Sequence, residues 1–332
     1  MKNFTKRNFV AVVACVAFAA GVLGLSGCNS KKDDGVKTIG VIQIIDHPAL
    51  NSARQGFIDG LADAGFVEGQ NVRFNLFNAQ GDPSNSRLMA KKIVEDESDL
   101  VLAISTPSAQ AIFNETNTIP IFITAVTDPL QAGLIDSFER PGTNVTGTSD
   151  LTPIAQQFAL MVRLIPNVRT VGIIYNSSEV NSQIQTDMAV EIARGMGLNT
   201  EIATVTGTVD VGQVTESIVG KVDVIYISTD NTLAASIPQV TRIADAAGVP
   251  VITGEEGGVH LGALATEGIN YYNLGKQTAA MAVRVLNGEA TPANMPIEYQ
   301  SETNVSINLD SAERLGITIP QDLLDVAELI RE

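Results

Sequence analysis

Short apolar runs alternate with amphipathic stretches along most of this 332-residue chain, and this alternation limits its possible folds more than any other feature. The runs, such as Thr38–Ile45 and Asp99–Ile104, have the length and continuous apolar character of strands buried on both faces. The stretches between them, such as Asn51–Ala64, place apolar residues at helical spacing and end at a glycine. This order of strands and helices predicts a parallel sheet covered by helices on both faces.

The same plan occurs twice. The matching segments are Val36–Ile42 with Val168–Ile174, Asp99–Thr106 with Asp223–Thr229, and Ile119–Thr124 with Val249–Thr253. Generic likeness between α/β strands is the alternative, but three matches in one order argue against it. The first pair is offset by 132 residues, which is too long for a solenoid repeat. The repeat therefore predicts two lobes of similar topology.

Residues 1–27 have the features of a signal peptide. A basic start precedes Phe9–Leu25, an uncharged run of 17 residues that is short for a membrane-spanning helix. The run ends in Leu25-Ser-Gly-Cys28, which resembles the lipobox of bacterial lipoproteins. This resemblance implies that Cys28 is the lipid attachment site, with palmitate as an expected acyl chain, and that residues 28–36 form a lipidated tether. An N-terminal membrane anchor that is never cut is the alternative.

The chain is acidic, with 37 acidic and 21 basic residues and a formal charge of −16. Removal of the signal peptide takes three positive charges (Lys2, Lys6 and Arg7) from this value and leaves −19. Such a balance excludes nucleic acid as an expected partner, because that affinity depends on clustered Lys and Arg. Cys15 leaves with the signal and Cys28 is committed to lipid, so no disulfide is expected in the secreted domain.

Motifs of catalytic chemistry are missing from the sequence. His47 and His260 are its two histidines, and no H-E-x-x-H, paired C-x-x-C or G-x-S-x-G occurs. Gly275-Lys276 superficially resembles part of a phosphate loop, but Asn270 stands where the first glycine is needed. We therefore expect no catalytic residues, no cofactor and no metal, and a binding protein instead of an enzyme.

Polar residues gather where the predicted strands end. In parallel α/β sheets, ligands bind beyond the carboxyl ends of the strands. The polar loops are Asp46–Ala49, Ser105–Ala109, Thr127–Pro129, Asn176–Asn181, Thr229–Thr232 and Gly254–Gly257. If the two lobes face one another, these loops line one cleft. Ordinary helix capping is the alternative explanation for any single residue among them.

The residue types in these loops suit an α-amino acid. Thr106 and Ser108 open a helix, and the free backbone N–H groups there can hold a carboxylate. Asp230 lies at the matching loop of the second lobe and can pair with an ammonium group. His47 is a candidate to close over the ligand, with a structural role as the alternative. The pair Glu255-Glu256 is expected at a solvated rim.

A series of short motifs runs through residues 37–330. They include His47–Leu50, Gly56–Leu61, Asn78–Gly81, Thr106–Gln110, Val126–Pro129, Gly147–Asp150, Gly172–Asn176, Asp230–Thr232 and Tyr271-Tyr272. In the order and spacing of these motifs, the chain resembles the substrate-binding lipoproteins of ABC transporters of the tryptophan/tyrosine-uptake type.

This resemblance implies a type I periplasmic-binding-protein fold, in which two similar, doubly wound parallel-sheet lobes are joined by three crossovers. Lobe 1 is then expected at 37–148 plus 268–292, and lobe 2 at 149–267 plus 293–332. A ligand is closed between the lobes by a hinge. The hinge segments are expected near Gly147–Asp150, Gly258–Ala263 and Gly288–Pro296.

The predicted function is capture of an amino acid, with an aromatic one favoured, on the extracytoplasmic face of the cell membrane and its delivery to an ABC permease. Tyr175, Tyr271 and Tyr272 are candidates for an aromatic pocket wall. A ligand-sensing lipoprotein with a signalling partner, or a receptor for a different small polar solute, is the alternative. The candidate ligand-binding residues are Asp46, His47, Thr106, Ser108, Ala109, Thr127, Asp128, Ser149, Asp150, Asn176, Asn181, Asp230, Asn231 and Tyr271.

Overall fold

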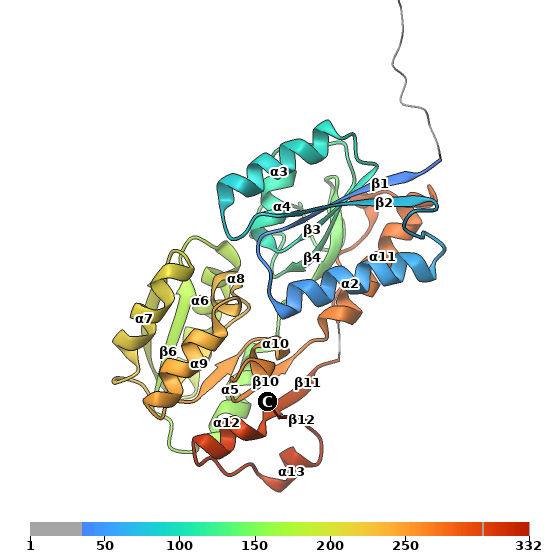
Figure 1. Cartoon of the computed structure of the whole chain (residues 1–332). Helices are drawn as coiled ribbons and strands as arrows, with labels where there is room; N and C mark the ends of the chain where they lie inside the picture. Colours follow the sequence, from blue (N-terminus) through green and yellow to red (C-terminus); the bar gives the residue numbers. More distant parts are fainter. Residues whose placement is uncertain (1–34, 301, 332) are drawn as a thin grey trace, which may run out of the picture. The chain divides into compact units, whose positions relative to one another are not determined.

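The computed structural model describes residues 35–300 and 302–331. The predicted signal peptide, Cys28 and most of the predicted tether lie outside these residues. Within the described ranges, none of the helices combines the length and the apolar character that crossing a bilayer requires. The chain from Lys37 onward forms one compact unit that contains two β-sheets, and each sheet is the centre of a lobe (Figure 1).

Lobe 1 is built on a five-stranded parallel sheet. Its strands, in spatial order, are β2 (Val72–Asn78), β1 (Lys37–Gln43), β3 (Leu100–Ile104), β4 (Ile121–Val126) and β5 (Val145–Ser149). Helices α3 (Pro83–Glu95) and α4 (Thr106–Phe113) cover one face, and α2 (Pro48–Asp63) and α11 (Tyr271–Leu286) cover the other. Successive residues of β3 pack into opposite cores, because side chains alternate across a strand. The continuous apolar run at this strand is therefore explained by burial on both faces.

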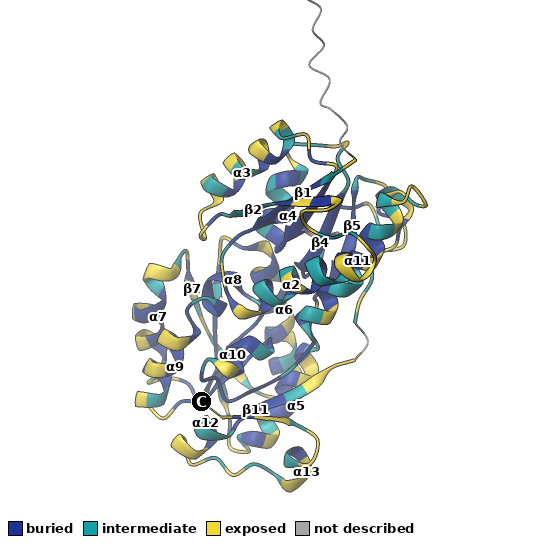
Figure 2. Ribbon diagram, turned by 45° about the vertical axis from the view of Figure 1, so that its right-hand side comes forward, coloured by how far each residue is buried: buried dark blue, intermediate teal, exposed yellow. Residues whose placement is uncertain are grey.

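Lobe 2 is built on a seven-stranded sheet. Its strands, in spatial order, are β12 (Glu328–Ile330), β11 (Asn304–Asn308), β10 (Ala265–Gly268), β9 (Val251–Thr253), β8 (Val224–Ile227), β6 (Thr170–Asn176) and β7 (Asn199–Val205). Helices α5 (Ile154–Leu164), α6 (Val180–Gly195) and α12 (Leu309–Arg314) contribute to one core, and α7 (Val211–Ile218) and α9 (Ile237–Ala246) contribute to the other. Short helices α8 (Asn231–Ala234), α10 (Glu256–His260) and α13 (Gln321–Leu324) complete the lobe. Figure 2 shows buried strands under helices whose outer faces are exposed.

The predicted repeat is confirmed in the topology. The order β2-β1-β3-β4-β5 in lobe 1 is matched by β7-β6-β8-β9-β10 in lobe 2. The three pairs of matching sequence segments correspond to β1 and β6, β3 and β8, and β4 and β9. The predicted class, two similar α/β lobes, is therefore confirmed.

The C-terminal part differs from the predicted parallel sheet. Strand β11 runs antiparallel to β10, so the sheet of lobe 2 is mixed. After α13, the chain forms β12 parallel to β11 at the edge of this sheet. The apolar residues Leu323 and Ile330 are both buried here, one on a helix and one on an edge strand.

The chain crosses between the lobes at three places, two of which differ from the prediction. The first crossing follows β5 at Ser149, as expected, and the second lies between β10 and α11 instead of near Gly258–Ala263. Residues 293–298, predicted in lobe 2, lie with lobe 1, because Ile297 packs in its core and Glu298 pairs with Thr148. The third crossing therefore falls after Glu298.

Helices α2 and α11 approach so closely that side chains are excluded at their crossing. A Cβ atom added to Gly56 would lie 2.0 Å from the carbonyl oxygen of Tyr272, and one added to Gly275 would lie 2.0 Å from that of Ala53. Both contacts are with backbone, which cannot move aside as a side chain can. Glycine at these positions therefore fixes how α11 packs on lobe 1.

We predict that Gly56→Ala and Gly275→Ala each lower the free energy of unfolding by about 1–3 kcal/mol, because the methyl group overpacks the helix crossing. Urea denaturation measures this change. Gly195→Ala is the matched control, since Gly195 is also helical but its Cβ would meet no atom within 4 Å. This control should leave stability unchanged or raise it by about 0.4–1 kcal/mol. Equal effects at all three positions would contradict the packing argument.

Candidate ligand-binding site

A small enclosed cavity lies at the carboxyl ends of the strands, between the two lobes. It is lined by His47, Leu50, Ala125, Asp150, Asn181, Thr229, Asp230, Asn231, Ala234, Glu255 and Tyr271. Its volume is about 10 Å³, which is enough for roughly one water molecule. An organic ligand therefore fits only if the lobes or the lining side chains move apart.

The wall from lobe 1 carries a buried histidine with unpaired nitrogens. His47 directly precedes α2 and is 8% exposed, and neither ring nitrogen has a hydrogen-bond partner among the described residues. Burial lowers its pKa to about 4, and the nearby Asn231 and Asp46 side chains offset only part of this effect. The imidazole is therefore neutral at pH 7 and offers one donor and one acceptor.

Two strained residues end neighbouring strands of lobe 1 at this edge. Ser105 after β3 has φ +86° and ψ +155°, and Ala125 at the end of β4 has φ +54°. These conformations are costly for residues with a Cβ, and such strain concentrates at functional sites. Ala125 lines the cavity, and Ser105 directs the chain into the first turn of α4.

The first turn of α4 holds polar groups that lack protein partners. The hydroxyl of Thr106 is buried and has no hydrogen-bond partner among the described residues. The backbone N–H groups of Thr106 and Ser108 lie at the helix start, where no preceding turn supplies an acceptor. The Ser108 hydroxyl accepts a hydrogen bond from the Ser105 hydroxyl at 3.3 Å. This turn is suited to an anion, although it does not line the cavity itself.

The wall from lobe 2 is built around two buried carboxyl groups. Asp230 accepts hydrogen bonds from the backbone N–H of Asn176 at 2.6 Å and from that of Leu233 at 2.9 Å, so it also caps α8. Glu179 accepts from the Thr232 hydroxyl at 3.0 Å and from the side-chain amide of Asn231. These bonds hold the loops after β6 and β8 in one fixed arrangement.

Glu255 completes this wall from the loop after β9. It is 4% exposed, and its carboxylate caps α10 by accepting a hydrogen bond from the Gly257 N–H at 2.6 Å. The expectation of a solvated rim is therefore wrong for Glu255. The cause is tertiary, because the start of α10 packs against α2: a Cβ on Gly257 would lie 2.8 Å from the Cβ of Pro48.

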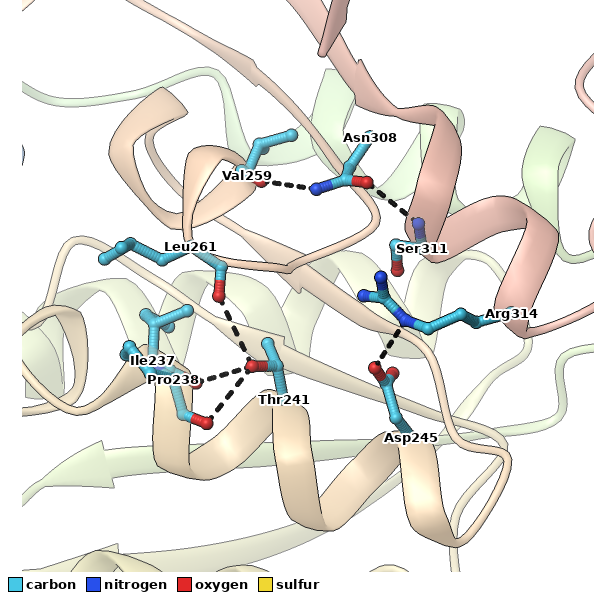
Figure 3. A network of polar contacts seen from close by, with 9 residues as sticks. All are labelled: Ile237, Pro238, Thr241, Asp245, Val259, Leu261, Asn308, Ser311 and Arg314. Atoms are coloured by element: carbon cyan, nitrogen blue, oxygen red, sulfur yellow. Dashed lines mark hydrogen bonds and ion pairs between the residues drawn. The ribbon is translucent and has the colours of Figure 1, made fainter. Parts of the chain in front are cut away.

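Polar contacts of Val259 and Leu261 connect α10 and its C-terminal end to β11 and α9 (Figure 3). The side-chain amide of Asn308 donates to the carbonyl oxygen of Val259 at 3.0 Å, and its side-chain oxygen accepts from the Ser311 N–H at 2.8 Å. The Thr241 hydroxyl of α9 lies 3.3 Å from the carbonyl oxygen of Leu261. Arg314 joins α12 to α9 through an ion pair with Asp245 at 3.1 Å.

The hinge contributes a third wall. The Tyr271 hydroxyl, at the first residue of α11, donates to Asp150 at 2.7 Å, and the Thr127 hydroxyl donates to the other oxygen of Asp150 at 3.2 Å. Beside this pair, the Gln300 side chain makes two hydrogen bonds to the backbone of Asn270, at 3.1 and 2.7 Å. These bonds connect the three crossing segments.

The cavity is suited to a positively charged group. Three buried carboxyl groups line it, while its lining in the described part of the chain contains neither lysine nor arginine. Burial raises the pKa of Asp150 to about 6 and of Glu255 to about 7. Burial and the neighbouring charge of Glu179 raise the pKa of Asp230 to about 7. A cation placed here would favour the ionised carboxylates and would itself be stabilised by them.

A wider groove of about 170 Å³ adjoins the cavity. Glu255 and Tyr271 line both spaces and so form their common wall. The remaining lining of the groove is Pro48, Ala49, Ser52, Glu256, Gly257, His260, Ile269, Asn270 and Tyr272. Tyr272, Pro48 and Ile269 give this groove an apolar, partly aromatic surface.

The structure brings six of the predicted site residues to the cavity: His47, Asp150, Asn181, Asp230, Asn231 and Tyr271. Others lie behind them or elsewhere. Thr127, Ser149 and Asn176 are buried and hydrogen-bond the surrounding loops, and Ala109 packs in the core of lobe 1. Asp46 is directed to an ion pair with Arg54, and Asp128 hydrogen-bonds Gln131 in its own turn.

Sequence reasoning missed Leu50, Ala125, Thr229, Ala234 and Glu255 as lining residues. Thr229 lies in one of the predicted polar loops, directly before the predicted Asp230. Leu50 and Ala234 follow recognised residues by three positions on a helix, and this spacing was a usable signal. Nothing in the local sequence marks Ala125, whose role follows from its backbone conformation.

Comparisons with known proteins agree on one family. The profile described as "ABC transporter substrate binding protein" matches residues 38–330. A "Tyrosine-binding protein" of Clostridioides difficile (strain R20291) is 42% identical over 313 residues, which are 90% of this chain and 90% of that protein. An ABC domain from Streptococcus pneumonia, solved in complex with L-Trp, has a TM-score of 0.86 at 37% identity and covers 89% of this chain and 100% of its own.

A second solved relative differs more in structure despite its higher identity. It is the ligand-free, open structure of a substrate binding protein with adhesive properties from Clostridium difficile. It is 43% identical and covers 89% of this chain and 99% of its own, but its TM-score is 0.68.

We predict that the ligand-free protein becomes more stable as the pH falls from about 8 to 5. The folded-state pKa values of Asp150, Asp230 and Glu255 lie above the ordinary values of 3.8 and 4.5, so between these limits the folded state binds more protons than the unfolded state. Their contribution to stability is full below the unfolded values and is lost as the pH rises through 6 to 7. Each pKa unit corresponds to about 1.4 kcal/mol.

Urea unfolding at a series of pH values measures this slope. Glu255→Gln should flatten it, because the variant cannot release the proton, whereas the exposed control Glu313→Gln leaves the cavity intact. A slope of the opposite sign, or an equal slope in Glu255→Gln, would refute the assignment.

Proposed function

Because this chain belongs to the ABC transporter substrate-binding protein family, we propose that it captures an α-amino acid, preferably an aromatic one, between its two lobes and delivers it to a membrane permease. Proteins of this family serve importers from outside the cytoplasm. The observation that carries the ligand assignment is the cavity whose lining, among the described residues, has three buried carboxyl groups and neither lysine nor arginine.

The polar groups around the cavity match the two charges of an amino acid. An ammonium group would contact the carboxylates of Asp230, Asp150 or Glu255, with strong charge-assisted hydrogen bonds. A carboxylate would take the unpaired N–H and hydroxyl groups in the first turn of α4. The relatives named for tyrosine and solved with L-Trp support this class of ligand.

An aromatic side chain finds suitable surface in the adjoining groove. Tyr271 and Tyr272 supply rings, and Pro48 and Ile269 supply apolar contact at the same place. Tyr175, the third predicted aromatic residue, lines neither space.

Ligand capture would involve closure of the lobes. The TM-score to the L-Trp complex is 0.86, against 0.68 for the open, ligand-free relative, although the latter is the more identical in sequence. A different angle between otherwise similar lobes would produce this reversal. A ligand that contacts both lobes stabilises the closed arrangement through those additional contacts.

The protein would act on a lipid tether. The lipobox-like end of the predicted signal supports acylation of Cys28, with release of residues 1–27. More than one acyl chain gives stable membrane attachment, whereas a single chain binds only marginally. The polar segment from Asn29 to Val36 would then separate the lipid from the folded lobes.

We predict that calorimetry will detect binding of L-tryptophan, L-tyrosine or L-phenylalanine with micromolar or lower Kd, and that N-acetylation of the same amino acid will abolish it. Acetylation removes the positive charge that the buried carboxylates require. Binding should weaken as the pH falls from 8 to 5, since the carboxyl groups must then lose a proton to pair with the ammonium. Failure of every α-amino acid to bind below the millimolar range would overturn the ligand assignment.

Substitutions test the cavity in the same assay. Asp230→Asn should raise Kd at least about tenfold, because a charge-assisted hydrogen bond is lost, while Glu313→Gln, which is exposed and lines neither space, should change Kd less than about twofold. The melting temperature of each variant serves as a control, since Asp230 also caps α8. Equal losses at both positions would remove the proposed role of Asp230.

We also predict that Cys28→Ala abolishes incorporation of radiolabelled palmitate. The signal peptide should remain uncut at this site, because the lipidated cysteine is part of the cleavage signal, so the variant should accumulate as a longer precursor that its apolar signal segment holds in the membrane fraction. Cys15→Ala is the control and should leave labelling unchanged. Labelling that persists in Cys28→Ala would exclude Cys28 as the attachment site.

A further inference from the structure

We propose that Gln185 and Thr127 form a latch between the lobes that sets ligand affinity without contact with the ligand. This inference rests on lobe closure as described in the proposed function. Neither residue lines the cavity, yet both are buried and each belongs to a different lobe. They are positioning residues.

Gln185 reaches across from α6 in lobe 2. It has no exposed surface, and its side-chain amide nitrogen donates to the Thr127 hydroxyl of lobe 1 at 3.4 Å. The same nitrogen also lies 3.2 Å from the carbonyl oxygen of Asn181 and 3.4 Å from that of Thr229. The Thr229 hydroxyl donates back to the Gln185 oxygen at 2.9 Å. Gln185 is thus held by its own lobe, and the two N–H groups of its amide are shared among two acceptors of that lobe and one of the other.

Thr127 also forms a hydrogen bond with a residue of the hinge. Its hydroxyl lies 3.2 Å from Asp150, and Asp150 accepts a second hydrogen bond from Tyr271. A continuous chain of hydrogen bonds therefore runs from lobe 2 through lobe 1 to two of the crossing segments. Asn181, Thr229, Asp150 and Tyr271 belong to or contact this chain, and all four line the cavity.

Opening the lobes would break one hydrogen bond of this series and leave the other hydrogen bonds intact. Gln185 would keep its partners on lobe 2, and Thr127 would keep Asp150, so only the bond between Gln185 and Thr127 depends on closure. Such a bond favours the closed state by about 2- to 10-fold. Ligand affinity falls by a similar factor when this preference is lost, since the ligand binds the closed state best.

A double-mutant cycle tests the latch. Gln185→Leu and Thr127→Val remove the amide and the hydroxyl with little change in size, and each should raise the Kd of the tightest-binding amino acid about 2- to 10-fold. The double variant should lose less than the product of the two single losses, because the bond between Gln185 and Thr127 is lost in both single variants. Thr127→Ser restores the hydroxyl and should restore the Kd. Gln183→Leu, on the exposed face of the same helix, is the matched control.

The latch would be overturned if the Kd increase in the double variant equals the product of the two single-variant increases. It would also be overturned if both single variants have Kd values within twofold of wild type. If wild type binds no amino acid, the proposed function fails, and the latch is then tested by small-angle scattering of the ligand-free chain. The radius of gyration should increase in Gln185→Leu and in Thr127→Val but not in Thr127→Ser. An unchanged radius in the first two variants would overturn the latch on its own.

Discussion

The packing of α11 on α2 is the contact on which the rest of the structure depends. Helix α11 follows lobe 2 in the chain but completes the helical layer of lobe 1, and glycines at the crossing allow its backbone to touch that of α2. The chain must therefore return from lobe 2 to lobe 1 and cross again to form β11. Three crossing segments, and hence a hinge, are consequences of this one docking. It also places Tyr271, the first residue of α11, against Asp150 of the first crossing.

The buried carboxyl groups oppose stability at neutral pH, and in the proposed function they would favour binding. In the ligand-free protein, burial raises the pKa values of Asp150, Asp230 and Glu255 above those of the unfolded chain, so raising the pH to neutral destabilises the folded state. A cationic ligand would reverse this pH dependence, because it pairs with the ionised carboxylates. The same three groups should therefore give ligand affinity and ligand-free stability opposite dependences on pH. A cavity with an apolar lining and no carboxyl groups would show neither pH dependence.

The sequence allowed the lobes and half of the cavity to be predicted, and the reasons for the remainder are physical. Strand β1 and helix α2 were visible because a continuous apolar run and apolar residues at helical spacing are local features of the sequence. Asp230 was visible because polar loops follow parallel strands. The burial of Glu255 was not, since it depends on α10 meeting the start of α2. Ala125 was not either, because a positive φ in a residue other than glycine is imposed by tertiary structure.

The unpaired polar groups explain why a ligand, and not the lobes alone, would determine closure. His47 and Thr106 of lobe 1 and the side-chain oxygen of Asn181 of lobe 2 are buried without partners, and each such group costs about 1–3 kcal/mol. The hydrogen bond between Gln185 and Thr127 offsets only part of these costs, so the ligand-free chain is expected to be partly open and partly closed. A zwitterion that reaches both walls would supply the missing partners and neutralise the carboxylates at once. The closed state is then favoured mainly when it is occupied, as a receptor that signals its loading to a permease requires.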